Sequence, residues 1–439
     1  MDVVTAPDDA RQDPHAHADL HTFGQSSRDL ARRSRETLLL SAVVGLITGA
    51  GVAGFETLVV RGLNLVYRLP LWCIAAAPLV GLTVAALALR WIGPASSPAT
   101  ADEYIHAFHD PDYPLPLRAL AARMIAGVAT LGSGAPMGLE GPSLYLGSSI
   151  GDALQRRFPR VFSAQNRRLL LVAGAAAGVA AIFKAPATGA VFALEVPYQN
   201  DLARHMLGPA LIGAASSYLA FVAFHGTTPL VNVTGTPPFS TKDLVAALAL
   251  GVLAGIGARA FAWMLRSAKR VSLTIPSWIR VPIAGASLAA IFVVARLLSG
   301  ENLTTGPGYD TIRWALDPSH SVALVAAILV LRCVATTTTV AGGGVGGLFI
   351  PLVVAGALVG RIVGGAVNAL DTSLFTVIGV AAFLGAGYRV PLAAVVFVAE
   401  ATGRPGFVVP GLLAAVIAEL LMGGKSVTIY QHAAPPGPE

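Results

Sequence analysis

Long apolar segments separated by short polar ones make up most of this chain of 439 residues. Several contain too many glycines and prolines to be single helices, and irregular backbone at membrane depth survives only where protein or a water-filled cavity satisfies it. The pattern predicts an all-α polytopic membrane protein with many tilted, broken helices, and it favours a transport pathway over a simple anchor. Eleven segments approach the roughly 20 residues that cross hydrocarbon: 37–60, 71–90, 120–135, 169–194, 205–224, 243–264, 281–298, 322–340, 347–370, 374–399 and 407–422.

Composition supports a membrane protein and excludes several other classes. The chain is 54% hydrophobic and 12% charged, against about 25% charged residues in soluble domains. A net charge of +6 is small for this length and gives no support for a nucleic-acid partner. Cys73 and Cys333 lie in apolar runs without metal-ligand spacing, so we expect buried thiols and no metal site or other cofactor. His205 and the pair Ser216 and Ser217 lack the partners that an intramembrane enzyme would need, so we expect no enzymatic activity.

Charged residues outside the apolar segments predict the orientation. Residues 1–34 are polar and predict a disordered tail, and residues 431–439 form a short second tail. Both tails are expected in the cytoplasm, because the positive-inside rule places basic clusters there. The basic clusters are Arg28, Arg32, Arg33 and Arg35 before the first span, then Arg156, Arg157, Arg160, Arg167 and Arg168, and a third loop with Arg266, Lys269, Arg270 and Arg280.

An internal repeat divides the chain into two halves, about residues 35–225 and 240–424. GLEGPSLYLGSSIG and GGLFIPLVVAGALVG each have a proline, Pro142 or Pro351, followed by glycines five and nine residues later. FKAPATGAVFALE and GYRVPLAAVVFVAE each have a basic residue two before the proline and a glutamate nine after it. The repeat pairs residues 138–142 with 346–351. Transporters built from such repeats bind substrate at the repeat interface, with half-helix N-termini pointing at anionic groups.

Glu140 is a lone carboxylate in an uncharged apolar run, between Gly138 and Gly141 and just before Pro142. Glycines allow close approach of a ligand to the backbone, and a helix start attracts anions. An acid here can occupy an anion site when ionised and leave it when protonated or displaced. The alternative is a favourable acid in an ordinary first helical turn.

The motifs GLEGP, GGLFIP and YRVPL...FVAE, in this order, resemble those of the CLC family of chloride channels and proton-coupled chloride antiporters. The resemblance covers about residues 37–430 and implies a transmembrane domain over 35–430 with inverted halves, in a homodimer with one pore per subunit. It implies chloride as the transported ion and the inner (plasma) membrane as the location. Glu140 matches the gating glutamate, and the matching anion-binding turns contain Gly138, Leu139, Gly141, Gly347, Leu348 and Phe349.

The sequence departs from the family pattern at several positions. The family usually has a basic residue directly before the gating glutamate, whereas this chain has Leu139 there. The ion-coordinating serine falls on Ala95 without a gap, or on Ser96 or Ser97 with a small shift. The inner tyrosine falls on Thr428 without a gap, whereas Tyr430, which we prefer as the hydroxyl donor, lies two residues further on.

The mechanism depends on a further departure, at Val196. Antiporters of the family often carry a proton-transfer glutamate at this position, and Glu195 beside it is only a weak substitute as a proton relay. We therefore expect passive, channel-like chloride conduction, with proton-coupled antiport as the alternative. A fluoride-selective member is less favoured, because GGLFIP keeps the chloride-type pattern. Glu195, Glu400, Lys184 and Arg389 are expected to be structural.

Overall fold

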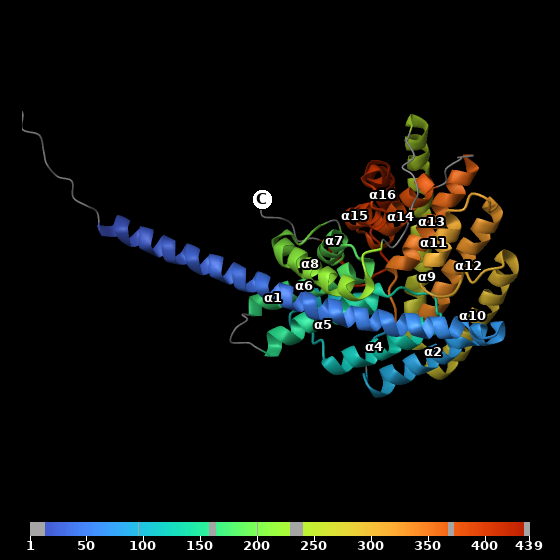
Figure 1. Cartoon of the computed structure of the whole chain (residues 1–439), viewed down its shortest axis with the longest axis horizontal. Helices are drawn as coiled ribbons and strands as arrows, with labels where there is room; N and C mark the ends of the chain where they lie inside the picture. The colour runs from blue at the N-terminus through green and yellow to red at the C-terminus, as the bar shows by residue number, and fades with distance from the viewer. Residues whose placement is uncertain are drawn as a thin grey trace, which may run out of the picture.

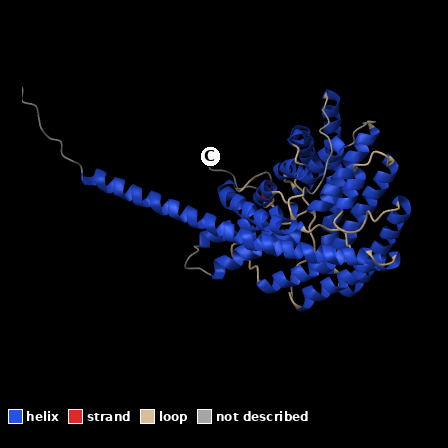
Figure 2. Cartoon of the chain, in the orientation of Figure 1, coloured by secondary structure: helices blue, strands red, loops and turns tan. Residues whose placement is uncertain are grey.

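The computed structural model describes residues 14–94, 96–157, 164–199, 201–228, 240–367 and 373–433 (Figure 1). Almost all of this part of the chain is helical (Figure 2). The first half contains α1 (Pro14–Tyr67), α2 (Leu71–Trp91), α3 (Thr100–His109), α4 (Leu117–Gly132), α5 (Glu140–Arg157), α6 (Ala164–Phe183), α7 (Pro186–Glu195) and α8 (Leu207–His225). The second contains α9 (Thr241–Thr274), α10 (Ser277–Ser299), α11 (Tyr309–Ala315), α12 (Val322–Ala341), α13 (Phe349–Ala366), α14 (Ser373–Tyr388), α15 (Pro391–Thr402) and α16 (Val408–Met422).

Helix α1 begins at Pro14 and extends well beyond the other helices in Figure 1. A disordered tail is expected for residues 1–34, and the structure instead has a helix from residue 14 onward. Proline at a helix start is favourable, and between positions 15 and 34 there is one glycine, Gly24, and no further proline. Residues 1–13 and 434–439, which include most of the second tail, lie outside the described residues. In the described part of the chain, two short strands, β1 (Tyr198–Gln199) and β2 (His432–Ala433), pair in parallel.

Two of the predicted apolar segments are broken into pairs of helices. Segment 169–194 forms α6 and α7, and segment 374–399 forms α14 and α15. Each break lies at a basic residue with left-handed backbone, Lys184 at φ 52° and Arg389 at φ 59°, and each following helix starts with proline. Eight described helices are long and apolar enough to cross a membrane, fewer than the eleven segments because the others are broken or short.

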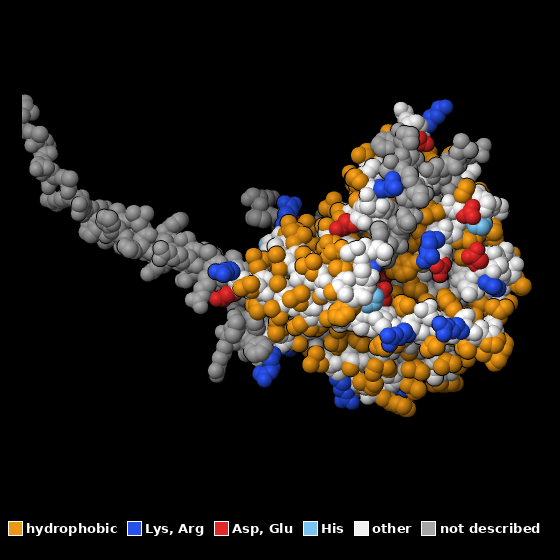
Figure 3. Space-filling model, viewed as in Figure 1, with side chains coloured by type: hydrophobic (Ala, Val, Ile, Leu, Met, Phe, Trp, Pro, Cys, Tyr) orange, Lys and Arg blue, Asp and Glu red, His pale blue; other side chains and the backbone are white. Residues whose placement is uncertain are grey.

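The outer surface is apolar, as expected for a protein surrounded by lipid. Hydrophobic side chains cover most of the face in Figure 3, and charged groups are sparse on it. Large apolar side chains stand out from the bundle, including Trp72 on α2 and Leu297 on α10, which are 74% and 81% exposed. In water such a surface would aggregate, so the fold is stable only with its sides in a bilayer.

The two halves pack alike. Helix α5 packs against α6 as α13 packs against α14, and a glycine at the same repeat position permits each contact. A Cβ on Gly147 would lie 1.9 Å from the carbonyl oxygen of Gly174, and one on Gly356 would lie 2.4 Å from that of Gly379. The glycines that reveal the repeat in the sequence are therefore needed for close helix packing.

Two glutamates cap helices reciprocally across the repeat. Glu195, at the end of α7, accepts hydrogen bonds from the amides of Leu392 (3.1 Å) and Ala393 (2.9 Å) at the start of α15. Glu400, on α15, accepts from the amides of Ala187 (3.0 Å) and Thr188 (2.7 Å) at the start of α7. Each carboxylate satisfies amides that have no partner within their own helix, so both glutamates join the halves.

Replacing Glu400 with alanine is expected to lower the free energy of unfolding by about 2 kcal/mol, because two amides at the start of α7 lose a charged acceptor. Thermal denaturation in detergent would measure the loss. Glutamine at position 400 keeps an acceptor and should cost less. A Glu400→Ala protein as stable as the parent would show that the caps do not hold the halves together.

Candidate anion-transport site

The site is built from two equivalent turns, one from each half. Each follows a helix, α4 or α12, and each contains a glycine with left-handed backbone, Gly134 at φ 90° and Gly343 at φ 80°. The turns meet in an antiparallel bridge in which Gly138 N–H donates to Gly347 O (2.9 Å) and Gly347 N–H donates to Gly138 O (2.6 Å). Helices α5 and α13 begin two residues after this bridge, so their N-terminal ends are brought together.

Glu140, the first residue of α5, reaches across the bridge to the start of α13. Its Oε1 accepts hydrogen bonds from the amides of Phe349 (2.6 Å) and Ile350 (3.3 Å). The residue is 3% exposed, and its Oε2 is buried without a hydrogen-bond partner among the described residues. A helix N-terminus attracts negative charge through its free amides and its dipole, so the carboxylate occupies a place where an anion would bind.

Both bridge glycines are needed for this arrangement. A Cβ on Gly138 would lie 1.9 Å from Glu140 Oε2, and one on Gly347 would lie 2.1 Å from Glu140 Oε1. Either side chain would take the volume that the carboxylate fills. At Gly141 a Cβ would lie 2.6 Å from the hydroxyl of Thr100 and 2.9 Å from the backbone of Gly346. The glycines of both motifs therefore shape the space around Glu140.

A cavity of about 140 Å³ opens beside these turns and is lined by both halves. Leu348, the residue before α13, lies in its wall, and the Leu348 amide faces the phenol oxygen of Tyr388. Thr100 and Thr428 also line the cavity and are 1% and 4% exposed. The Thr100 hydroxyl has no hydrogen-bond partner in the part of the chain that the structure describes. An anion in this cavity would have several hydroxyl groups in its walls, of which those of Thr100, Tyr388 and Thr428 belong to buried residues.

The structure brings most of the predicted site residues together. Gly138, Gly141, Gly347, Leu348 and Phe349 surround Glu140 or the adjacent cavity. Leu139 is buried, and its carbonyl accepts hydrogen bonds from Ser143. This position therefore contributes backbone and no charge to the turn.

The predicted hydroxyl ligands are placed less favourably than two residues that the sequence analysis missed. Ser97 lines the cavity, but its hydroxyl accepts a hydrogen bond from the Ala99 amide (3.1 Å). Ser96 is not among the lining residues, and Ala95 lies outside the described residues. Thr100 and Tyr388 carry the buried hydroxyls instead. Their sequence signals were weak: Thr100 follows GPASSP, and Tyr388 precedes the Arg389–Pro391 break.

The C-terminal hydroxyl is likewise better placed at Thr428 than at Tyr430. Tyr430 is 38% exposed and stacks on His106 with ring centroids 4.6 Å apart, at the rim of the cavity. Thr428 is buried in the cavity wall. This differs from the expected preference for Tyr430, because the chain after α16 turns the residue at position 428 inward.

Glu195, the weak candidate for a proton relay, lies outside this cavity. Both of its oxygens cap α15, and it lines a separate cavity of about 630 Å³ with Arg389 and Glu419. Val196 beside it is buried and has no titratable group. The structure therefore does not place Glu195 in the cavity beside Glu140.

Known proteins resemble this chain in sequence and in fold. A sequence model described as voltage gated chloride channel matches residues 81–423. The H(+)/Cl(-) exchange transporter ClcA of Citrobacter koseri is 28% identical over 92% of this chain and 90% of its own length, and that of Salmonella arizonae is 27% identical over the same shares. A slow cyanobacterial Cl-/H+ antiporter has a TM-score of 0.77 at 23% identity, covering 89% of this chain and 96% of that one. A CLC-type fluoride/proton antiporter has the same TM-score and identity over 91% and 98%.

The fold is therefore that of a CLC-type transporter, and the prediction of an all-α polytopic membrane protein with inverted halves is confirmed. The family match covers most of the chain. This protein belongs to the voltage gated chloride channel family, the CLC family that its motifs resemble.

Proposed function

We propose that this protein exchanges chloride for protons across a membrane, with Glu140 as the group that couples the two ions. The observation that carries the proposal is the position of the Glu140 carboxylate on the amides of Phe349 and Ile350. A carboxylate on an anion site competes with the transported anion. Protonation removes its charge and frees the site, so anion entry and proton uptake are linked.

Exchange replaces the passive conduction that Val196 led us to expect. The curated relatives are described as H(+)/Cl(-) exchange transporters, and this supports the antiport alternative. The missing acid at position 196 is then a difference in the inner proton route and does not remove coupling.

The test is simultaneous recording of chloride flux and external pH in proteoliposomes. An outward chloride gradient should drive protons inward against their gradient, and a protonophore should collapse the proton gradient. Chloride flux without proton movement would restore the passive channel. Fluoride in place of chloride tests selectivity, and transport of fluoride alone would point to the fluoride-selective alternative.

The anion ligands are part of this proposal: the Phe349 and Leu348 amides, with Thr428 as the C-terminal hydroxyl. Thr428→Val is expected to raise the chloride dissociation constant about fivefold, because one hydrogen bond to a charged ligand is lost. Tyr430→Phe should have little effect, since Tyr430 lies at the rim. Isothermal titration of each variant with chloride would decide, and the opposite ranking would return the role to Tyr430.

The homodimer, the inner-membrane location and the cytoplasmic N-terminus also belong to this proposal. The dimer rests on the family resemblance, and exposed apolar side chains such as Leu219 on α8 and Leu420 on α16 fit a subunit contact as well as they fit lipid. Counting photobleaching steps of labelled protein in vesicles would test it. Labelling of a cysteine placed near the N-terminus, from one side of the membrane at a time, would test the orientation.

A further inference from the structure

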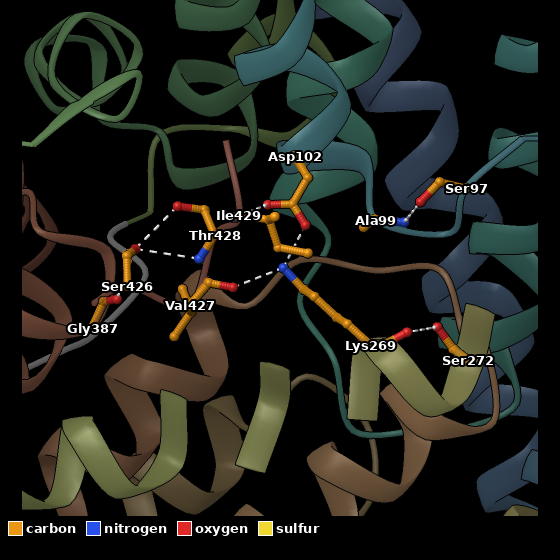
Figure 4. Close-up of polar contacts among 10 residues, drawn as sticks. All are labelled: Ser97, Ala99, Asp102, Lys269, Ser272, Gly387, Ser426, Val427, Thr428 and Ile429. Atoms are coloured by element: carbon orange, nitrogen blue, oxygen red, sulfur yellow. Dashed lines mark hydrogen bonds and ion pairs between the residues drawn. The ribbon is translucent and has the colours of Figure 1, made fainter. Parts of the chain in front are cut away.

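A buried ion pair outside the repeat motifs lies beside the cavity. Lys269 Nζ, on α9, is 2.5 Å from Asp102 Oδ2, on α3 (Figure 4). The two residues are 7% and 2% exposed. The charge pattern placed Lys269 in a basic cytoplasmic loop, but α9 continues through it to Thr274. Burying two charges costs several kcal/mol per ion unless pairing and further hydrogen bonds compensate, so the other contacts of this pair matter.

Each member of the pair also bonds the chain that follows α16. Lys269 Nζ donates to the carbonyl of Val427 (2.7 Å), and Asp102 Oδ1 accepts from the amide of Ile429 (3.1 Å). Figure 4 shows Asp102 and Lys269 in contact with each other and both bonded to residues 427–429, here called the C-terminal strap. Thr428 lies between the two bonded residues, so the pair fixes the backbone on both sides of it.

The strap and α3 both contribute to the cavity wall. Thr428 and Thr100 both line the cavity, and Asp102 stands two residues after Thr100 in the first turn of α3. One ion pair therefore sets the position of both hydroxyls relative to each other. The strap has a separate attachment, because the Val427 amide donates to Gly387 O (2.9 Å), and this bond does not involve the ion pair.

We propose that Asp102 and Lys269 are positioning residues that hold the C-terminal strap against α3 and thereby set the affinity of the cavity for a small anion. The inference rests on the proposed function, since it assumes that Thr428 contacts the transported ion. Without the pair, the strap keeps its bonds to Gly387 and the contact between the Thr428 and Ser426 hydroxyls (3.0 Å), but it loses its attachment to α3 and α9 on the side of the cavity. Binding then requires ordering the Thr428 hydroxyl, and that entropy cost weakens the anion site.

The test is chloride binding to the purified full-length protein, measured by titrating sodium chloride into protein in chloride-free buffer. Asp102→Ala is expected to raise the chloride dissociation constant by up to about fivefold, the loss expected for removing the Thr428 hydroxyl itself, because the bonds to Ile429 and Lys269 are both lost. Asp102→Asn keeps an acceptor for the Ile429 amide and should have a smaller effect. Melting temperatures of both variants show whether they are folded. If Asp102→Ala does not fold, Asp102→Asn still provides the test.

A matched control is Asp152→Asn. Asp152 is also buried and ion-paired, with Arg167 Nε at 2.6 Å, but it does not line the cavity. Its variant should bind chloride like the parent even if its melting temperature falls. Equal loss of affinity in Asp152→Asn and Asp102→Asn would show a general effect of destabilisation and overturn the positioning role.

Two combined variants separate positioning from simple electrostatics. If the pair acts through Thr428, Asp102→Ala should add little to the loss already caused by Thr428→Val, whereas independent effects would multiply. The charge reversal Asp102→Lys with Lys269→Asp restores the attraction between the two side chains. It cannot restore the backbone bonds, because the new lysine would face the Ile429 amide, also a donor, and the new aspartate would face the Val427 carbonyl, also an acceptor. It should not restore affinity. Multiplying effects, or full rescue by the reversal, would overturn the inference.

The proposed function and this inference fail in different ways. A parent protein that binds no chloride and moves no protons in vesicles contradicts the proposed function. A parent protein that binds and exchanges chloride, with Asp102→Ala equal to it in affinity, contradicts only the role of the ion pair.

Discussion

Glu140→Gln is expected to abolish chloride-driven proton transport while chloride still crosses the membrane. The amide cannot take up or release a proton, so anion binding is no longer tied to protonation. Proton flux in proteoliposomes should fall by about 100-fold or more, the lower range for loss of a proton-transfer group. Chloride flux should persist and lose its dependence on pH, because Glu140 is the buried carboxylate on the amides of Phe349 and Ile350.

Glu400→Gln is the matched control for this experiment. It also neutralises a glutamate that accepts amide hydrogen bonds at a helix start, but at α7 and away from the cavity. This variant should keep proton coupling, with some loss of stability. Proton transport that survives in Glu140→Gln, or disappears equally in both variants, would show that Glu140 is not the coupling group.

Gly347→Ala is expected to reduce chloride flux at least about tenfold. The new Cβ would lie 2.1 Å from Glu140 Oε1 and 2.6 Å from the Gly141 amide, so the methyl group would fill the position of the Glu140 carboxylate, where we propose that the anion binds. Forcing a methyl group into a packed site costs about 1–3 kcal/mol, and here that cost falls on the bound anion or carboxylate. Flux and chloride titration would measure the loss.

Gly54→Ala provides the comparison, because no heavy atom lies within 4 Å of a Cβ built at Gly54 in α1. Alanine is also the better helix former. This variant should transport like the parent. A Gly347→Ala protein with parental flux would mean that the anion passes elsewhere.

The sequence indicated the meeting of the two helix starts at Glu140, because the signals for it are local in the chain. Glu140, Gly138 and Pro142 stand together, and their repeat partners stand at matching spacing near Phe349. A helix start needs those residue types whatever surrounds it. The broken spans were equally readable, since Pro186 and Pro391 cannot continue the preceding helices.

The hydroxyl groups of the cavity could be predicted only in part: the motif comparison offered Thr428 as the position without a gap, but it did not indicate Thr100 or Tyr388. Thr100, Tyr388 and Thr428 meet only when three distant segments pack, and no local pattern fixes which way a threonine points. Lys269 shows the same limit. Its neighbours Arg266 and Arg270 indicate a basic surface, but position 269 falls on the buried side of α9, where Asp102 supplies the opposite charge.

The meeting of α5 and α13 at the Gly138–Gly347 bridge also limits how much charge the site can hold. A helix N-terminus carries roughly half a positive charge, so two of them together balance about one negative charge. That capacity matches one docked carboxylate or one small anion and falls short of both. Swapping an ionised Glu140 for chloride, with the glutamate protonated, keeps the site electrically balanced. Under the proposed function, the two helix N-termini would therefore couple anion binding to protonation through charge balance alone.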